Sequence, residues 1–120
     1  MSDLRVNLCG VELPNPLILA SGILGTGAEL LARVAGAGAG AVTAKSCSLE
    51  PRAGHPNPTV LAWEHGLINA VGLANPGVEA EVEELRRTRV LLQPLGAGLV
   101  ASVFADTIDN FARVAARLVE

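Results

Sequence analysis

The chain has 120 residues, of which 50% are hydrophobic, and it carries a formal net charge of -3. These totals are typical of one globular domain or of part of one, and they exclude a disordered chain. An aromatic content of 2% and the lack of a basic run argue against nucleic-acid binding, which needs a positive patch and stacking surfaces. The apolar runs are short and interrupted, so the sequence predicts no membrane contact, no signal peptide and a cytoplasmic location.

The first predicted elements are a hairpin, a strand and a helix. Residues 4–13 alternate apolar and polar side chains around a Cys-Gly turn, which predicts a β-hairpin. The apolar run Leu17–Ala20 predicts a strand buried on both faces. Ser21–Gly27 is a glycine-rich turn that opens into a helix over 28–35. Its G-x-x-G-x-G order reverses the dinucleotide-binding fingerprint, so we do not assign a Rossmann fold.

A second predicted strand ends at the only lysine in the sequence. Ala41–Ala44 lies between Gly40 and the polar segment Ser46–Ser48, and it predicts a buried strand with Lys45 at its carboxyl end. The order strand, helix, strand predicts parallel pairing. Ligands collect outside the carboxyl ends of parallel strands. Lys45 is therefore either a site residue or a solvated amine, and its position alone does not decide between the two.

The cysteines and histidines form no recognisable metal or redox motif. Cys9 and Cys47 are far apart and have no spaced histidines to complete a metal site, so we predict no metal. We expect both thiols to be reduced. Cys47 either fills a loop or, because it lies near an amine, acts as a low-pKa nucleophile. His55 and His65 are predicted to be loop residues.

A long excursion follows the lysine strand. Residues 48–58 contain three prolines and no clear periodicity, and connections of this length are usually functional or disordered. Short strands are predicted at 60–63 and 66–68, followed by a loop over 69–77. Asn69 in that loop offers donors and an acceptor that suit an imide or amide edge of a ligand. Asparagine also favours turns for local reasons, so both roles stay open.

The last predicted elements are a helix from Val78, a buried strand at Leu99–Phe104 and a capped helix from Ile108. We predict that the charged side chains of both helices are solvated. Three strand–helix units are visible, whereas a (β/α)8 barrel of about 250 residues has eight. We therefore expect an α/β fold that is the N-terminal part of a (β/α)8 TIM barrel preceded by a β-hairpin, with residues 1–120 in one incomplete domain.

Three segments resemble the N-terminal signatures of the dihydroorotate dehydrogenase family, in the correct order and spacing. They are residues 15–22, 45–52 and 69–77. The Leu-Glu-Pro-Arg loop and the missing membrane extension are most similar to class 1 enzymes, and within them to the NAD-linked 1B subclass. The resemblance implies an FMN-containing barrel that oxidises dihydroorotate to orotate in pyrimidine biosynthesis. It also implies a homo-oligomer when full length, with a partner subunit that carries FAD and an iron–sulfur cluster.

The resemblance also implies site residues. FMN would be contacted by Ala20, Ser21, Gly22, Lys45, Ser46 and Ser102. Substrate would be bound by Lys45 together with Asn69, Ala70, Val71, Gly72 and Leu73. Ser102 departs from the family, because many relatives have asparagine there. The catalytic base, a loop cysteine in class 1 enzymes, is expected beyond Glu120, so we assign no catalytic residue within this chain.

Two other functions stay open from the sequence. The chain could belong to a dihydropyrimidine dehydrogenase-like flavin barrel, which would bind uracil in place of orotate. It could also be a non-catalytic fragment that only binds a partner barrel fragment. Because the base and the phosphate-binding loops are expected elsewhere, we predict that the 120-residue chain alone neither retains FMN tightly nor turns over dihydroorotate.

Overall fold

The computed structural model describes residues 4–24 and 27–119. Its strands are β1 (Val6–Leu8), β2 (Val11–Leu13), β3 (Ile18–Leu19), β4 (Ala41–Thr43), β5 (Val60–Trp63), β6 (Gly66–Asn69) and β7 (Gly98–Val100). Its helices are α1 (Ala28–Gly36), α2 (Val78–Leu92), the 3-10 turn η1 (Gln93–Leu95) and α3 (Ile108–Val119). The order of these elements along the chain agrees with the sequence prediction.

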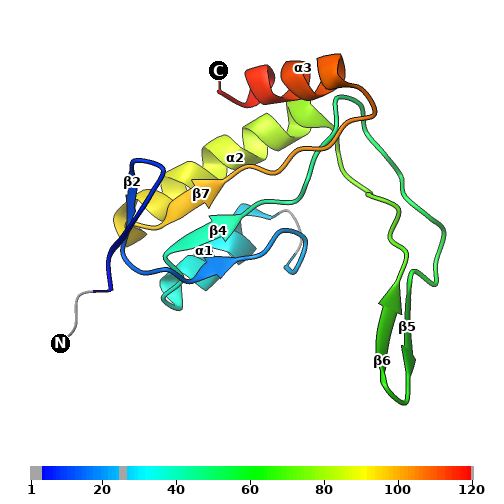
Figure 1. Ribbon diagram of the computed structural model, residues 1–120, viewed down its shortest axis with the longest axis horizontal. Coiled ribbons are helices and arrows are strands. Elements are labelled where there is room, and N and C mark those ends of the chain that lie inside the picture. Colours follow the sequence, from blue (N-terminus) through cyan, green and yellow to red (C-terminus); the bar gives the residue numbers. More distant parts are fainter. Residues whose placement is uncertain (1–3, 25–26, 120) are drawn as a thin grey trace.

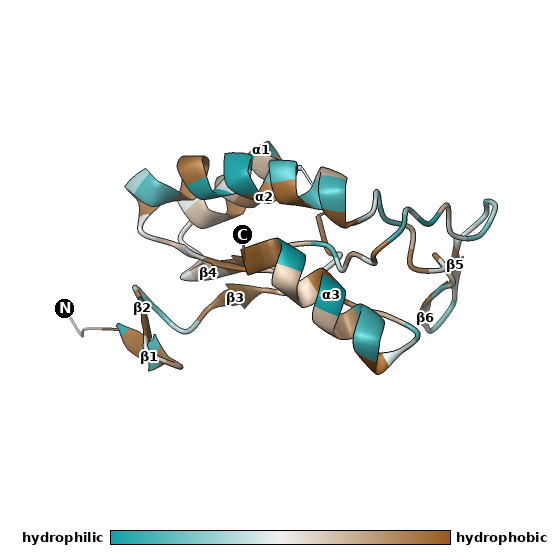
Figure 2. Cartoon of the chain, turned by 90° about the horizontal axis from the view of Figure 1, so that it is seen from above, coloured by the Kyte–Doolittle hydropathy of each residue, from teal (hydrophilic) through white to brown (hydrophobic). Residues whose placement is uncertain are grey.

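A three-stranded parallel sheet forms the centre of the fold (Figure 1). The strand order is β3-β4-β7, and Val42 of β4 lies opposite both Leu19 and Leu99. Helices α1 and α2 lie side by side on one face of this sheet (Figure 2). The α/β class and the parallel pairing are therefore confirmed.

The β1–β2 hairpin closes the amino end of the sheet. Its two strands pair antiparallel, as predicted. Leu13, only 3% exposed, lies where Gly98 begins β7. A Cβ atom on Gly98 would lie 2.7 Å from the Leu13 Cδ2 atom, so the glycine makes room for the leucine. The carboxyl end of the sheet is left open to the loops that carry the predicted site.

Two apolar clusters hold the helices against the sheet. The first contains Leu31, Ala35, Val42, Ala44 and Leu92, and the second contains Cys47, Val78, Val82 and Val114. The predicted burial of β4 is confirmed, because Ala41 and Val42 are both 0% exposed. The prediction that the strand in Leu17–Ala20 is buried on both faces is wrong, because Leu17 is 67% exposed and Ile18 is 42% exposed. The reason is that β3 is an edge strand of the sheet.

The third predicted strand, Leu99–Phe104, is also corrected. Regular pairing ends at Val100, and only an isolated bridge between Cys47 and Val103 continues it. Val100 is 37% exposed, so this strand is not fully buried. Like β3, β7 is an edge strand, and within the described part of the chain it pairs with β4 alone.

A long arm, residues 52–75, projects from the sheet (Figure 1). At its base Arg52 and Asn75 exchange two backbone hydrogen bonds of 2.9 Å, and at its tip β5 pairs antiparallel with β6. The connection after the lysine strand is therefore ordered along its length. Every residue of both tip strands is exposed, including the apolar Leu61, Trp63, Leu67 and Ile68.

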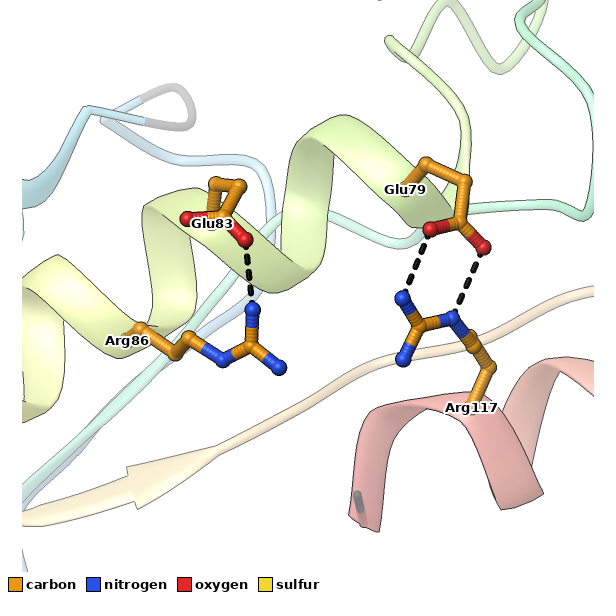
Figure 3. A network of polar contacts seen from close by, with 4 residues as sticks. All are labelled: Glu79, Glu83, Arg86 and Arg117. Atoms are coloured by element: carbon orange, nitrogen blue, oxygen red, sulfur yellow. Dashed lines mark hydrogen bonds and ion pairs between the residues drawn. The ribbon is translucent and has the colours of Figure 1, made fainter.

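Charged side chains join α3 to α2 on the outer surface (Figure 3). Arg117 donates two hydrogen bonds of 2.8 Å to the carboxylate of Glu79, and this contact lowers the Glu79 pKa. Arg86 pairs with Glu83 one turn away on α2. Glu79, Glu83 and Arg86 are exposed, as predicted for the charged faces, whereas Arg117 is half-buried. In the part of the chain that the structure describes, no helix is long and apolar enough to cross a membrane.

Candidate functional site

The carboxyl ends of the three parallel strands bring the predicted FMN-contacting residues together. Ser21 follows β3, Lys45 and Ser46 follow β4, and Ser102 follows β7. Backbone hydrogen bonds continue past the strand ends, from Ala44 N–H to the Val100 carbonyl at 2.9 Å and from Cys47 N–H to the Ser102 carbonyl at 3.0 Å. These bonds hold residues 45 and 46 in register with residue 102.

Three hydroxyl groups form a chain across this edge. The Ser21 hydroxyl donates to the Ala44 carbonyl at 2.8 Å, and its oxygen lies 3.4 Å from that of Ser46. The Ser46 and Ser102 oxygens are 2.7 Å apart, a full hydrogen bond. All three serines are half-buried. Polar groups from three strands therefore meet along one edge of the sheet.

The amine of Lys45 lies beside the turn that follows Ser21. Gly22 has a φ of 77°, and a Cβ atom at that position would lie 3.7 Å from both Cδ and Nζ of Lys45. The lysine side chain therefore reaches back toward the turn after β3. Its ammonium group forms no ion pair or hydrogen bond with any other residue that the structure describes. A cation placed in this way can bind an electron-rich or anionic group of a ligand.

The predicted substrate residues 69–73 lie on the arm and not at the strand ends. Asn69 ends β6 and is exposed, opposite Val60 in the hairpin. Within residues 4–24 and 27–119, no hydrogen bond joins this segment to Lys45 or to the three serines. The arm itself fixes the far end of the segment, because Arg52 Nε donates to the Gly72 carbonyl at 2.9 Å.

Close packing also restricts Gly72. Its φ is 76°, and a Cβ atom there would lie 2.6 Å from the His55 ring and 2.8 Å from the His55 nitrogen. Leu73 has a positive φ of 57°, which is uncommon for a residue with a side chain. The segment therefore has a defined backbone path, which the predicted loop did not specify.

Asn75 was not predicted as a site residue, yet it is the most connected side chain at the base of the arm. Its amide oxygen accepts from the backbone nitrogens of Gly77 and Ser48, at 2.9 and 3.2 Å. Its amide nitrogen donates to the Leu73 carbonyl and the Ser48 hydroxyl, at 2.9 and 3.0 Å. The sequence signal was the Asn-Pro-Gly triplet, which is typical of a turn. Asn75 thereby connects the lysine loop to the predicted substrate segment.

Cys47 fills space and is not a reactive thiol. It is 0% exposed, and burial raises its pKa to about 11, with the nearby Glu81 carboxylate adding to the effect. A thiol with this pKa is protonated near neutral pH and is a poor nucleophile. The loop-filling alternative is therefore supported and the nucleophile alternative is not. Both cysteines are free thiols, as predicted.

Glu81 corrects the prediction that all charged residues of α2 are solvated. It is 1% exposed, and neither carboxylate oxygen has a hydrogen-bond partner among the described residues. Burial raises its pKa to about 7, and the Glu84 carboxylate adds to the shift. The helical spacing held the signal, because Glu81 lies between Val78 and Val82 on the buried stripe.

The predicted site is an open edge and not a closed pocket. A cavity of about 770 Å³ lies elsewhere, between α2, β7 and α3, where Leu85, Ala97 and Leu118 are among its lining residues. None of the predicted FMN or substrate residues lines it. The arrangement that can act chemically is therefore the strand-end edge with its amine and hydroxyl groups.

The fold is a parallel sheet with helices on one face, and the Lys45 amine and the serine hydroxyls lie at its carboxyl edge. These features define an α/β protein with a candidate ligand site at the strand ends. The family model described as dihydroorotate dehydrogenase matches residues 3–120. The chain belongs to the dihydroorotate dehydrogenase family.

Similar proteins are the catalytic subunits named dihydroorotate dehydrogenase B (NAD(+)). The one from Methanocaldococcus jannaschii is 43% identical over 115 residues, which are 96% of this chain and 38% of that protein. The one from Pyrococcus abyssi is 45% identical over 117 residues, which are 98% of this chain and 38% of that protein. The chain thus spans less than two-fifths of the length of these curated relatives.

Solved structures share the fold. A crystal structure of DHODH from Eimeria tenella in complex with ferulenol aligns with a TM-score of 0.74 and 23% identity. The alignment covers 97% of this chain and 34% of the Eimeria chain. The ligand-free form from the same organism aligns with a TM-score of 0.72.

Proposed function

We propose that this chain supplies the N-terminal part of an FMN-dependent enzyme that oxidises dihydroorotate to orotate in pyrimidine biosynthesis. The supporting observation is that Lys45 and three hydrogen-bonded serine hydroxyls follow the ends of β3, β4 and β7, in a member of this family. In this proposal residues 1–120 are one part of a single (β/α)8 barrel, namely the leading hairpin and three strand–helix units. The complete protein is cytoplasmic.

The strand-end edge fits a flavin in chemistry. Ala20 and Gly22 are small and exposed, so the backbone after β3 can approach a planar ring. FMN, when bound, accepts the hydride from the substrate. The residues that would hold it are Ala20, Ser21, Gly22, Lys45, Ser46 and Ser102, with hydroxyl groups as donors and acceptors at its polar edge.

Lys45 supplies positive charge at this edge. A reduced flavin carries negative charge, and an ammonium about 4 Å from a unit negative charge contributes about 4 kcal/mol at an effective dielectric near 20. Lys45 therefore favours electron acceptance and also orients the substrate. Residues Asn69 to Leu73 bind the substrate through the Asn69 amide and the backbone, and the proton is removed by a base outside this chain.

The partners follow from the subclass. The relatives from Methanocaldococcus and Pyrococcus are named as catalytic subunits of an NAD-linked enzyme. In this proposal the complete protein forms a homo-oligomer and passes electrons to a subunit that carries FAD and an iron–sulfur cluster.

The experiment is a hybrid in which this chain is followed by the C-terminal part of the Methanocaldococcus relative. We expect stoichiometric FMN in the purified hybrid and loss of the visible flavin absorbance when dihydroorotate is added without air. The 120-residue chain alone is the matched control, and we expect it not to retain flavin. A hybrid that folds but binds no FMN, or that responds to dihydrouracil and not to dihydroorotate, contradicts the proposal.

A further inference from the structure

The direction of donation in the hydroxyl chain at the strand ends follows from a count of its hydrogens. Each serine hydroxyl has one hydrogen to donate and two lone pairs that accept. The Ser21 hydrogen is used on the Ala44 carbonyl at 2.8 Å. Toward Ser46 the Ser21 oxygen can therefore only accept. This fixes the inner end of the chain, while either oxygen of the Ser46–Ser102 pair can be the donor.

Two arrangements of the remaining hydrogens are compatible with these distances. In the first, Ser102 donates to Ser46 and Ser46 donates to Ser21, so Ser102 offers only lone pairs to a ligand. In the second, Ser46 donates to Ser102, and the Ser102 hydrogen is available to a ligand. The 2.7 Å bond exists in both arrangements. They differ in the direction of this bond and in whether Ser46 also donates to Ser21, a contact that at 3.4 Å is long and weak.

We infer that Ser102 is a reversible hydrogen-bond partner, with Ser46 and Ser21 behind it, for a ligand atom that accepts a hydrogen bond when oxidised and donates one when reduced. A flavin ring nitrogen that gains a proton on reduction has this property, so the inference rests on the proposed function. Ser102 donates to the oxidised form and accepts from the reduced form at nearly equal cost. It positions the ring and favours the reduced form only through the weak contact between Ser46 and Ser21, whereas the Lys45 ammonium only donates.

The pattern of effects in two variants tests this inference in the hybrid. Ser102→Ala removes the partner of both forms, so the dissociation constants of oxidised and reduced FMN should both rise by about three- to tenfold, and their ratio should change by no more than about two- to threefold, the effect expected for Ser21→Ala. Ser21→Ala removes the acceptor that the first arrangement needs. It should therefore weaken reduced FMN more than oxidised FMN, by about two- to threefold, and lower the midpoint potential.

The measurements are titrations of FMN and of reduced FMN in the absence of air, together with the midpoint potential. Ser21→Thr, which keeps a hydroxyl, is the matched control and should restore the ratio of the two dissociation constants. A tenfold imbalance in Ser102→Ala would appear as a shift of about 30 mV for this two-electron couple and would overturn the inference. An unchanged ratio in Ser21→Ala would also overturn it. Failure of the unsubstituted hybrid to bind FMN would instead overturn the proposed function, and this inference with it.

Discussion

At the scale of single residues, Lys45 is the side chain on which the proposed activity most depends. Its side chain lies against the turn after β3, because a Cβ atom on Gly22 would lie 3.7 Å from Nζ. Arginine keeps the charge but has a larger planar head with a different donor geometry. We expect Lys45→Arg in the hybrid to lower the turnover of dihydroorotate by about 10- to 100-fold, because donors misplaced by about 1 Å can cost this much.

Steady-state rates with dihydroorotate measure the effect of Lys45→Arg. Arg33→Lys is the reverse change on the exposed side of α1, and it should leave the rate unchanged. Unchanged turnover in Lys45→Arg would remove Lys45 from the site.

Glu81 makes stability depend on pH. Its folded pKa of about 7 lies above the ordinary value of 4.5, so the fold favours the protonated form. The stabilisation is fully present below pH 4.5 and is lost as the pH rises through about 7. The loss amounts to about 3 kcal/mol in the free energy of unfolding. Glu81→Gln should therefore stabilise the chain by about this amount near pH 8 and have little effect near pH 4.5.

Urea unfolding at the two pH values measures the difference. Glu84 and Cys47 are the titratable groups coupled to Glu81, and Cys47 stays protonated over this range. Glu83→Gln, on the exposed face of the same helix, is the control and should give the same small change at both pH values. An equal effect of Glu81→Gln at both pH values would show that the carboxylate is not buried in solution.

The strand-end position of Lys45 could be predicted from the order of elements, because a residue that follows a parallel strand lies at the carboxyl edge of the sheet. The three serines were implied by the resemblance, and the structure shows that they lie at the same edge. Asn75 was missed because its role depends on Ser48, which is distant in the sequence. Glu81 was missed because charge was given more weight than its position on the helical stripe.

At the scale of elements, types and boundaries were predicted better than burial. The helix Val78–Leu92 and the tip strands follow from local periodicity and turn residues, which lie within a few positions of each other. Burial of β3 depends on which neighbours the strand has in the sheet. Leu17 and Ile18 are apolar enough for a buried strand, yet they are exposed at the edge of a three-stranded sheet.

The geometry at the base of the arm depends on the Asn75 amide. Asn75→Ala leaves the Gly77 nitrogen and the Leu73 carbonyl without their partner. We expect a loss of about 1–3 kcal/mol in the free energy of unfolding. Backbone amides of Arg52 and His55, which pair across the arm, should exchange faster with solvent.

Hydrogen exchange followed by NMR separates a local effect from a global one. Asn110→Ala is the matched control, because that amide bonds to Asp106 at the start of α3. It should leave the arm amides unchanged. Protection of Arg52 and His55 that is equal in Asn75→Ala and in the original chain would contradict the role of Asn75.

At the scale of the whole molecule, the chain exposes more surface than a compact protein of its mass. Its accessible surface is 7991 Å², whereas a compact monomer of 12.3 kDa exposes about 6,100 Å². Its radius of gyration is 15.7 Å, against about 13.6 Å expected for 120 residues. The excess of about 1,900 Å² is more than twice the roughly 800 Å² that each partner buries in a standard protein–protein interface. No local sequence pattern indicates this excess, because it arises from edge strands and a projecting arm.

The excess surface predicts association. The edges of β3 and β7 offer unpaired backbone groups, and the arm exposes apolar side chains on both of its faces, Leu61 on one and Leu67 on the other. We expect the chain alone to self-associate as its concentration rises. With the C-terminal part of the Methanocaldococcus relative, it should form instead a one-to-one complex, because barrel strands then pair with both edges.

Light scattering on each part and on the mixture measures these masses. Val100→Lys places a charge on β7 that disfavours edge pairing, so it should weaken both self-association and the complex. Arg33→Lys on α1 is again the neutral control. The prediction is contradicted if the chain stays monomeric at high concentration and does not bind the complementary part. The edges of β3 and β7 would then be protected in solution, and pairing at these edges would not complete the proposed barrel.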